Sequence, residues 1–158
     1  MNNEIVKRRP DLAALLYDVI HRSRHAEEKD GRLNVYGIPV FGVRDGKFTS
    51  HYSRTYVEAA QELDTVPQMS DAQWEALDLL AEVAEEVCME MSFEPGDMQL
   101  LNNHVILHAR NAYEDAAKRR CLKRIWLSMP NSRALPEDQA ALWRNVGPGA
   151  LRGGIAQA

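Results

Sequence analysis

The sequence predicts an α+β domain, because two kinds of hydrophobic pattern follow one another along it. Apolar residues recur with helical spacing in residues 11–21 and again after Ser70. Three other segments, residues 35–43, 47–52 and 122–129, are rich in β-branched and aromatic residues or alternate between polar and apolar ones. Together these patterns favour sheets with flanking helices.

The helical patterns are of different strengths. The first covers residues 11–21, where Pro10 is suited to a helix start and one apolar stripe follows: Leu12, Leu15, Leu16, Val19 and Ile20. Residues 56–63 return to helical spacing. The clearest helix begins at Ser70, which can form a capping box with Gln73. Its apolar stripe predicts packing on the core.

The strand patterns begin with a hairpin. Residues 35–43 and 47–52 surround Arg44-Asp45-Gly46, which predicts two paired strands joined by a Gly-containing turn. Residues 98–101 and 105–107 have the composition of short strand pieces, and residues 122–129 alternate as a strand does.

The length and composition fit one soluble domain. The chain has 158 residues, 45% of them hydrophobic, and a formal net charge of −4. Residues 1–135 are predicted to form the domain, and residues 136–158 a polar, poorly ordered tail. We expect no nucleic-acid partner, because no basic block offsets the acidic balance.

No apolar run approaches the length of a membrane helix, and residues 1–10 do not resemble a signal peptide. Cys88 and Cys121 form neither a disulfide framework nor a zinc motif. The sequence therefore predicts no membrane association and a reducing, cytoplasmic setting.

His108 is the histidine whose surroundings point to chemistry. It ends the apolar run Val105-Ile106-Leu107, where the chain enters the polar residues 110–118. A strand end beside a loop can present an imidazole to a metal from a rigid scaffold. A single histidine is more often structural, and the pattern alone leaves both roles open.

Arg124 is the second candidate, in the predicted strand 122–129 on the same face as Trp126. A connection of this length lets two strands return antiparallel, which would bring His108 and Arg124 to one mouth of a sheet. A planar guanidinium at an inward strand position suits a bidentate carboxylate. The alternative is an ion pair within the chain, for instance with Asp97 or Glu114.

Several stretches carry a resemblance to a known family. They are residues 95–110, which run from Pro95-Gly96-Asp97 through Asn102-Asn103 to His108, then Tyr113-Glu114-Asp115, Arg119-Arg120 and Leu122-Lys123-Arg124-Ile125-Trp126-Leu127. Together they resemble the C-terminal signature of the taurine dioxygenase (TauD/TfdA-like) family. Residues 9–12, 36–41 and 52–60 also resemble upstream parts of its bacterial members.

The resemblance implies a fold, a chemistry and roles for particular residues. The fold is a partial double-stranded β-helix (jelly roll, clavaminate synthase-like) with flanking helices. The chemistry is that of an Fe(II)- and 2-oxoglutarate-dependent dioxygenase that uses O2 to hydroxylate a small organic substrate. His108 would be a metal ligand and Arg124 the anchor for 2-oxoglutarate, with Arg120 a second basic residue near the co-substrate.

The resemblance leaves one part of the metal site without a match. Family members hold iron with two histidines and one carboxylate, and the first two ligands form a His-x-Asp or His-x-Glu pair upstream. The literal match here, His25-Ala26-Glu27, lies in a polar, loop-like stretch and not at a strand end. We therefore expect an incomplete chain that starts after the ligand pair. A homo-oligomer or a complementing chain would supply the rest, or the chain is an inactive fragment or interaction module.

For the substrate the sequence offers two weaker candidates. Arg54 and Tyr52 follow the second hairpin strand and could face the pocket to bind an anionic group. The alternative for Arg54 is a surface arginine beside a helix start.

Overall fold

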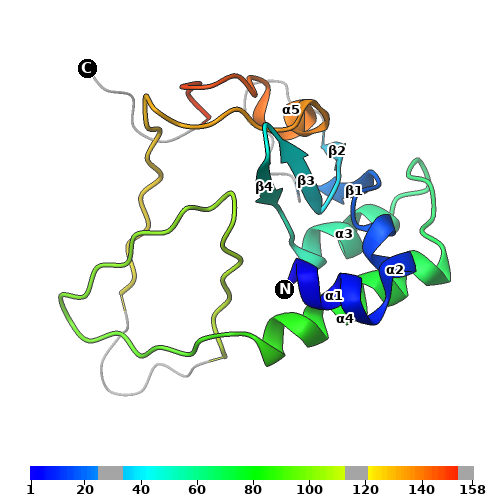
Figure 1. Ribbon diagram of the computed structural model, residues 1–158, viewed down its shortest axis with the longest axis horizontal. Coiled ribbons are helices and arrows are strands. Elements are labelled where there is room, and N and C mark those ends of the chain that lie inside the picture. Colours follow the sequence, from blue (N-terminus) through cyan, green and yellow to red (C-terminus); the bar gives the residue numbers. More distant parts are fainter. Residues whose placement is uncertain (25–33, 113–120, 153–158) are drawn as a thin grey trace.

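Four helices pack together in the part of the molecule formed by the first half of the chain (Figure 1). The computed structural model describes residues 1–24, 34–112 and 121–152. The helices are α1 (Asn2–Arg8), α2 (Pro10–Leu15), α3 (Arg54–Gln61) and α4 (Asp71–Glu86). α4 packs against α1 and α2, while α3 packs against the first strand.

Two antiparallel ribbons lie beside these helices. β1 (Ile20–Ser23) pairs with β2 (Val35–Ile38), and β3 (Phe41–Arg44) pairs with β4 (Lys47–Ser50). The turn from β3 to β4 has positive φ at both Asp45 and Gly46, 51° and 69°. Positive φ at both central residues is the geometry that matches the strand twist of a two-residue hairpin, so the predicted hairpin turn is confirmed.

The predicted strand at residues 35–43 is instead two strands. Pro39 lies between β2 and β3, and the next two amide groups, those of Val40 and Phe41, both donate to the carbonyl of Leu16 at 3.0 and 2.9 Å. Proline has no N–H for a ladder and restricts the residue before it. Pro39 therefore causes the break between β2 and β3, which the β-rich composition of residues 35–43 did not indicate.

The predicted helix over residues 11–21 is too long. α2 ends at Leu15, and β1 begins at Ile20, which pairs with Ile38. The apolar spacing fits a helix, but β-branched residues also favour a strand when a partner is available. Ile20 is 2% exposed, so pairing with β2 and packing on the core decide its conformation.

The hydrophobic core lies between α4, the N-terminal helices and β3. Its buried residues come from helices and strands alike: Ile5, Leu12, Ala13, Leu16, Ile20, Val40, Phe41, Val57, Ala76, Leu77, Leu80 and Val83. α4 supplies four of these, of which Leu77 and Leu80 belong to the predicted apolar stripe, and the expectation that α4 packs on the core is confirmed.

The start of α4 provides a local test of the fold. The Ser70 side chain accepts a hydrogen bond from the Gln73 amide at 3.3 Å, and the Gln73 side chain accepts one from the Ser70 amide at 2.9 Å. Ser70→Ala should lower the free energy of unfolding by about 1 kcal/mol, measured by urea denaturation. Ser53→Ala is the matched control, because Ser53 is the N-cap of α3 but makes no side-chain cap bond. Equal losses in the two variants would contradict this role for the box.

Residues 87–129 are called the motif segment here, and its described parts, residues 87–112 and 121–129, run away from the helices as open chain (Figure 1). The predicted strands at residues 98–101, 105–107 and 122–129 are not formed, apart from an isolated bridge at Leu127. A strand is defined by pairing, and within the described ranges these residues have no sheet to join. The α+β class is thus confirmed by helices and two small sheets, without a described jelly roll.

The C-terminal segment returns to the ribbons. η1 (Glu137–Gln139) and α5 (Ala140–Trp143) follow Leu135, which is buried and donates its amide to Val146 at 2.8 Å. Arg44 fixes this segment to β3 by donating to the Leu135 carbonyl at 2.7 Å. Residues 136–152 therefore differ from the poorly ordered tail that their polarity suggested, and residues 153–158 lie outside the described part.

Candidate functional site

The motif segment is attached to the folded body through His104. The His104 carbonyl accepts the Ser50 amide of β4 at 2.8 Å and Arg133 Nη2 of the C-terminal segment at 3.3 Å. Asn102 shapes the chain here, since its side chain accepts the His104 amide at 3.1 Å and its carbonyl accepts the Val105 amide at 3.0 Å. These bonds make a turn at the gap between the two predicted strand pieces, residues 98–101 and 105–107, and His104 lies four residues before His108.

Two histidines flank one tryptophan at this attachment. The Trp143 ring meets the His104 ring edge-to-face at 5.4 Å between centroids, and the His51 ring at 6.2 Å. Burial is the main cause that lowers the pKa of both histidines to about 4, with a smaller effect from the charge of Arg22 on His51 and of Arg152 on His104. Both rings are therefore neutral at pH 7, which suits a contact that joins β4, the motif segment and α5.

This cluster predicts acid sensitivity. Unfolded histidine has a pKa of 6.5, so between pH 6.5 and 4 the unfolded chain binds more protons than the folded chain. Stability is therefore complete above pH 6.5 and falls as the pH drops towards 4, by about 3 kcal/mol for His51. Urea denaturation at several pH values should show this fall, and His51→Phe should show a smaller one. The same pH dependence in the variant would contradict the prediction.

Arg22 is a buried cation that the sequence reasoning did not single out. Its side chain is 0% exposed, and its Nη atoms donate to the carbonyls of Ile20, Ile38 and His51 at 2.9, 2.5 and 3.1 Å. Burial lowers its pKa to about 10. Arg22 therefore ties the β1–β2 ribbon to the end of β4. Its neighbours His21 and Ser23 are polar, so the sequence pattern carried no signal that this arginine is buried.

His108 lies exposed in the motif segment. Within the described ranges no group of three histidine, cysteine, aspartate or glutamate side chains could hold a metal ion. Asp97 caps its own turn, where its carboxylate accepts the Glu94 amide at 2.8 Å. The described residues thus supply His108 but not two further ligands, and they do not fit an iron site by themselves. His25, Glu27 and Arg120 lie outside the described residues.

Arg124 is also exposed, and its guanidinium carbon lies 5.3 Å from the centre of the Trp126 ring. This contact is consistent with the predicted shared face of the two residues, and cation–π stacking limits the conformations of the arginine. Among the described acids, none forms an ion pair with Arg124, while Glu114 lies outside the described part. No described contact joins Arg124 to His108.

Tyr52 and Arg54 lie at the start of α3. Arg54 donates to Glu58 at 2.8 Å and to Asp78 at 2.7 Å, and its guanidinium stacks on Trp74 at 4.8 Å. Burial raises the pKa of Tyr52. Two carboxylates already balance the Arg54 charge, which fits the alternative of an arginine beside a helix start. A substrate role for the two residues stays a prediction.

Comparison with known proteins places the chain near a family of oxygenases. A family model described as "Taurine catabolism dioxygenase TauD, TfdA family" matches residues 3–126. FR-33289 synthase of Streptomyces rubellomurinus (strain ATCC 31215) is 28% identical over 141 residues, which cover 85% of this chain and 42% of that protein.

A second relative matches over a shorter stretch. The taurine hydroxylase-like protein SAT17 of Stachybotrys chartarum (strain CBS 109288 / IBT 7711) is 48% identical over 44 residues, 28% of this chain and 11% of that protein. The chain thus matches less than half the length of these curated relatives. Within the described ranges, no helix is both long enough and apolar enough to cross a bilayer.

Proposed function

Since the chain belongs to the TauD/TfdA family, we propose that it forms part of an Fe(II)- and 2-oxoglutarate-dependent dioxygenase that uses O2 on a small organic substrate. The observation that supports this most is that the family match, residues 3–126, includes both His108 and Arg124. In this proposal His108 is one metal ligand, and Arg124 holds the distal carboxylate of 2-oxoglutarate with Arg120 nearby.

The contact of Arg124 with Trp126 supports the anchoring role. A guanidinium binds a carboxylate through two parallel N–H groups, and it does so best when its plane is already oriented. Trp126 orients the plane from one face and leaves the N–H edge available. Because the described acids leave Arg124 unpaired, an external carboxylate would gain a charge-assisted bond without displacing an internal one.

The motif segment supports the jelly-roll part of the proposal. Large apolar side chains are exposed along it, among them Met98 at 84%, Leu100 at 79%, Ile125 at 68% and Leu127 at 64%. Patches of this kind mark surfaces that another element covers. In the proposal these residues become strands of a partial double-stranded β-helix when a second copy or a complementing polypeptide supplies partner strands, and the complementing polypeptide also supplies two further metal ligands.

A second candidate function has its own support. We propose as the alternative that the chain is an inactive member of the fold that serves as an interaction module, since the described residues provide one metal ligand where the chemistry needs three. Cys88 and Cys121 are free thiols, which supports a reducing, cytoplasmic setting for either candidate.

One assay separates the two candidates. The purified full chain is incubated with Fe(II), 2-oxoglutarate and O2, and succinate is measured against a metal-free control. Succinate formation that requires Fe(II) supports the dioxygenase. Its absence, in the chain alone and after mixing with a candidate complementing polypeptide, supports the interaction module.

A further inference from the structure

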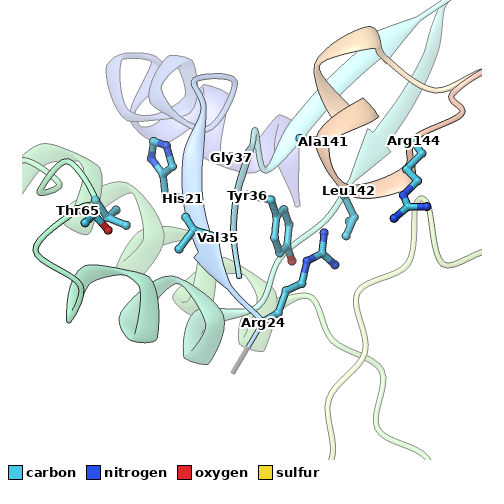
Figure 2. Close-up of a pocket in the computed structure, with 10 residues that line it drawn as sticks. His21, Arg24, Val35, Tyr36, Gly37, Thr65, Ala141, Leu142 and Arg144 are labelled. Carbon is cyan, nitrogen blue, oxygen red and sulfur yellow. The ribbon is translucent and has the colours of Figure 1, made fainter. Parts of the chain in front are cut away.

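A cavity of about 470 Å³ lies between the β1–β2 ribbon and α5 (Figure 2). Its walls come from β1, β2, the loop after α3 and the end of α5, and none of its lining residues belongs to the motif segment. Its volume falls in the range of small-molecule sites, which commonly combine apolar walls with a few polar groups.

The polar groups of this cavity are mainly basic. His21, Arg24 and Arg144 line it. The remaining wall is largely apolar and includes Val66 and Leu142. A basic, partly apolar cavity suits an anion that carries a hydrocarbon or aromatic body.

Arg24 is held in a fixed orientation. Its guanidinium carbon lies 4.4 Å from the centre of the Tyr36 ring, and Tyr36 is only 7% exposed. In Figure 2, Arg24, Leu142 and Arg144 lie on one side of the Tyr36 ring, while His21 and Thr65 lie towards the opposite end of the group. The cavity is therefore cationic at one end, and its other end offers groups that can form hydrogen bonds.

Arg144 reaches the cavity from a strained turn. Its φ and ψ are 60° and −59°, and the Asn145 amide donates to the Trp143 carbonyl at 2.7 Å across it. This is a γ-turn of the rare, strained hand, which costs free energy at a residue with a side chain. Strained backbone of this kind is found at ligand sites, where it positions a side chain.

We propose that this cavity binds a small organic anion, with its carboxylate or phosphate head at Arg24 and Arg144 and its apolar body against Tyr36 and Leu142. The two guanidiniums would supply charge-assisted hydrogen bonds to the head. The site needs neither iron nor 2-oxoglutarate, so it goes beyond the proposed dioxygenase. Binding at this cavity can therefore be tested independently of dioxygenase activity.

Calorimetric titration of the full, metal-free chain tests the site with three probes. These are 2-naphthoate, its neutral analogue 2-naphthamide, and inorganic phosphate, which has the charge without the apolar body. We expect 2-naphthoate to bind at one site and more tightly than either other probe. Arg24→Gln and Arg144→Gln should each weaken it about tenfold, because each removes a charge-assisted bond.

Two further variants separate a binding role from a structural one. Arg144→Gly relieves the strained turn and removes the charge, so it should raise the melting temperature while weakening 2-naphthoate binding. Lys47→Gln is the matched control, since it removes one exposed positive charge outside the cavity and should bind as the wild type does. Equal affinity for 2-naphthamide or phosphate, or unchanged 2-naphthoate binding in both arginine-to-glutamine variants, would overturn the proposal.

Discussion

His108→Ala should lower Fe(II)-dependent succinate formation about a hundredfold or more in any assembly of this chain that is active. The three protein ligands of such a site act together, and removal of one imidazole leaves the metal weakly held. Succinate release at saturating 2-oxoglutarate measures the effect. Because His108 is exposed and has no described partner, the substitution should not change the melting temperature.

The matched control for this variant is His25→Ala. His25 belongs to the literal His-x-Glu sequence that the loop-like context argues against as a ligand pair. We expect His25→Ala to retain activity. Loss of activity in His25→Ala with full activity in His108→Ala would reverse the assignment of the ligands.

Arg124→Gln should raise the KM for 2-oxoglutarate about 10- to 100-fold, since it removes a bidentate, charge-assisted contact to the distal carboxylate. The maximal rate should change much less, because the arginine binds the co-substrate away from the bond that reacts. Steady-state rates of succinate formation at a series of 2-oxoglutarate concentrations separate the two parameters.

Lys123→Gln is the control for Arg124→Gln. It removes the same charge one position earlier, on the opposite face of the alternating sequence, and Lys123 is exposed as Arg124 is. Its KM should stay within a factor of about two of the wild-type value, as expected for a screened surface charge. A similar rise in KM for both variants would point to general electrostatic attraction and not to an anchoring arginine.

Local chemistry explains which parts of the fold the sequence predicts correctly. The Ser70–Gln73 capping box and the Asp45-Gly46 turn depend on a few neighbouring residues, and both are present as expected. The end of α2 depends instead on β1 pairing with β2, a contact between residues about fifteen positions apart. The helical spacing of apolar residues from Leu16 to Ile20 could not show that pairing of β1 with β2 would end the helix.

The motif segment illustrates the same limit more strongly. Residues 122–129 alternate as a strand does, yet Ile125 and Leu127 are exposed because the described chain offers no sheet beside them. Alternation of polar and apolar residues indicates that a segment suits a half-buried strand, but it does not show that a neighbouring strand is available to pair with it. The sequence also gave no sign of the contact between His51, Trp143 and His104, which joins three segments through tertiary packing.

The candidate site, too, could be predicted from the sequence only in part. Residue types and spacing single out His108 and Arg124, and the resemblance assigns their roles, but their mutual position depends on strand pairing that the described residues do not make. Arg54 shows why type alone is insufficient, since its charge is already balanced by Glu58 and Asp78.

Paramagnetic NMR on the full chain tests the central claim most directly, because it detects a weak metal site without requiring turnover. Mn²⁺ replaces Fe(II), and the ring signals of the five histidines are followed with and without 2-oxoglutarate. We expect the His108 signals to broaden, more strongly when 2-oxoglutarate is present, and the 2-oxoglutarate effect to disappear in Arg124→Gln. Sharp His108 signals while those of His25 broaden, or the same 2-oxoglutarate effect in Arg124→Gln and wild type, would contradict the account.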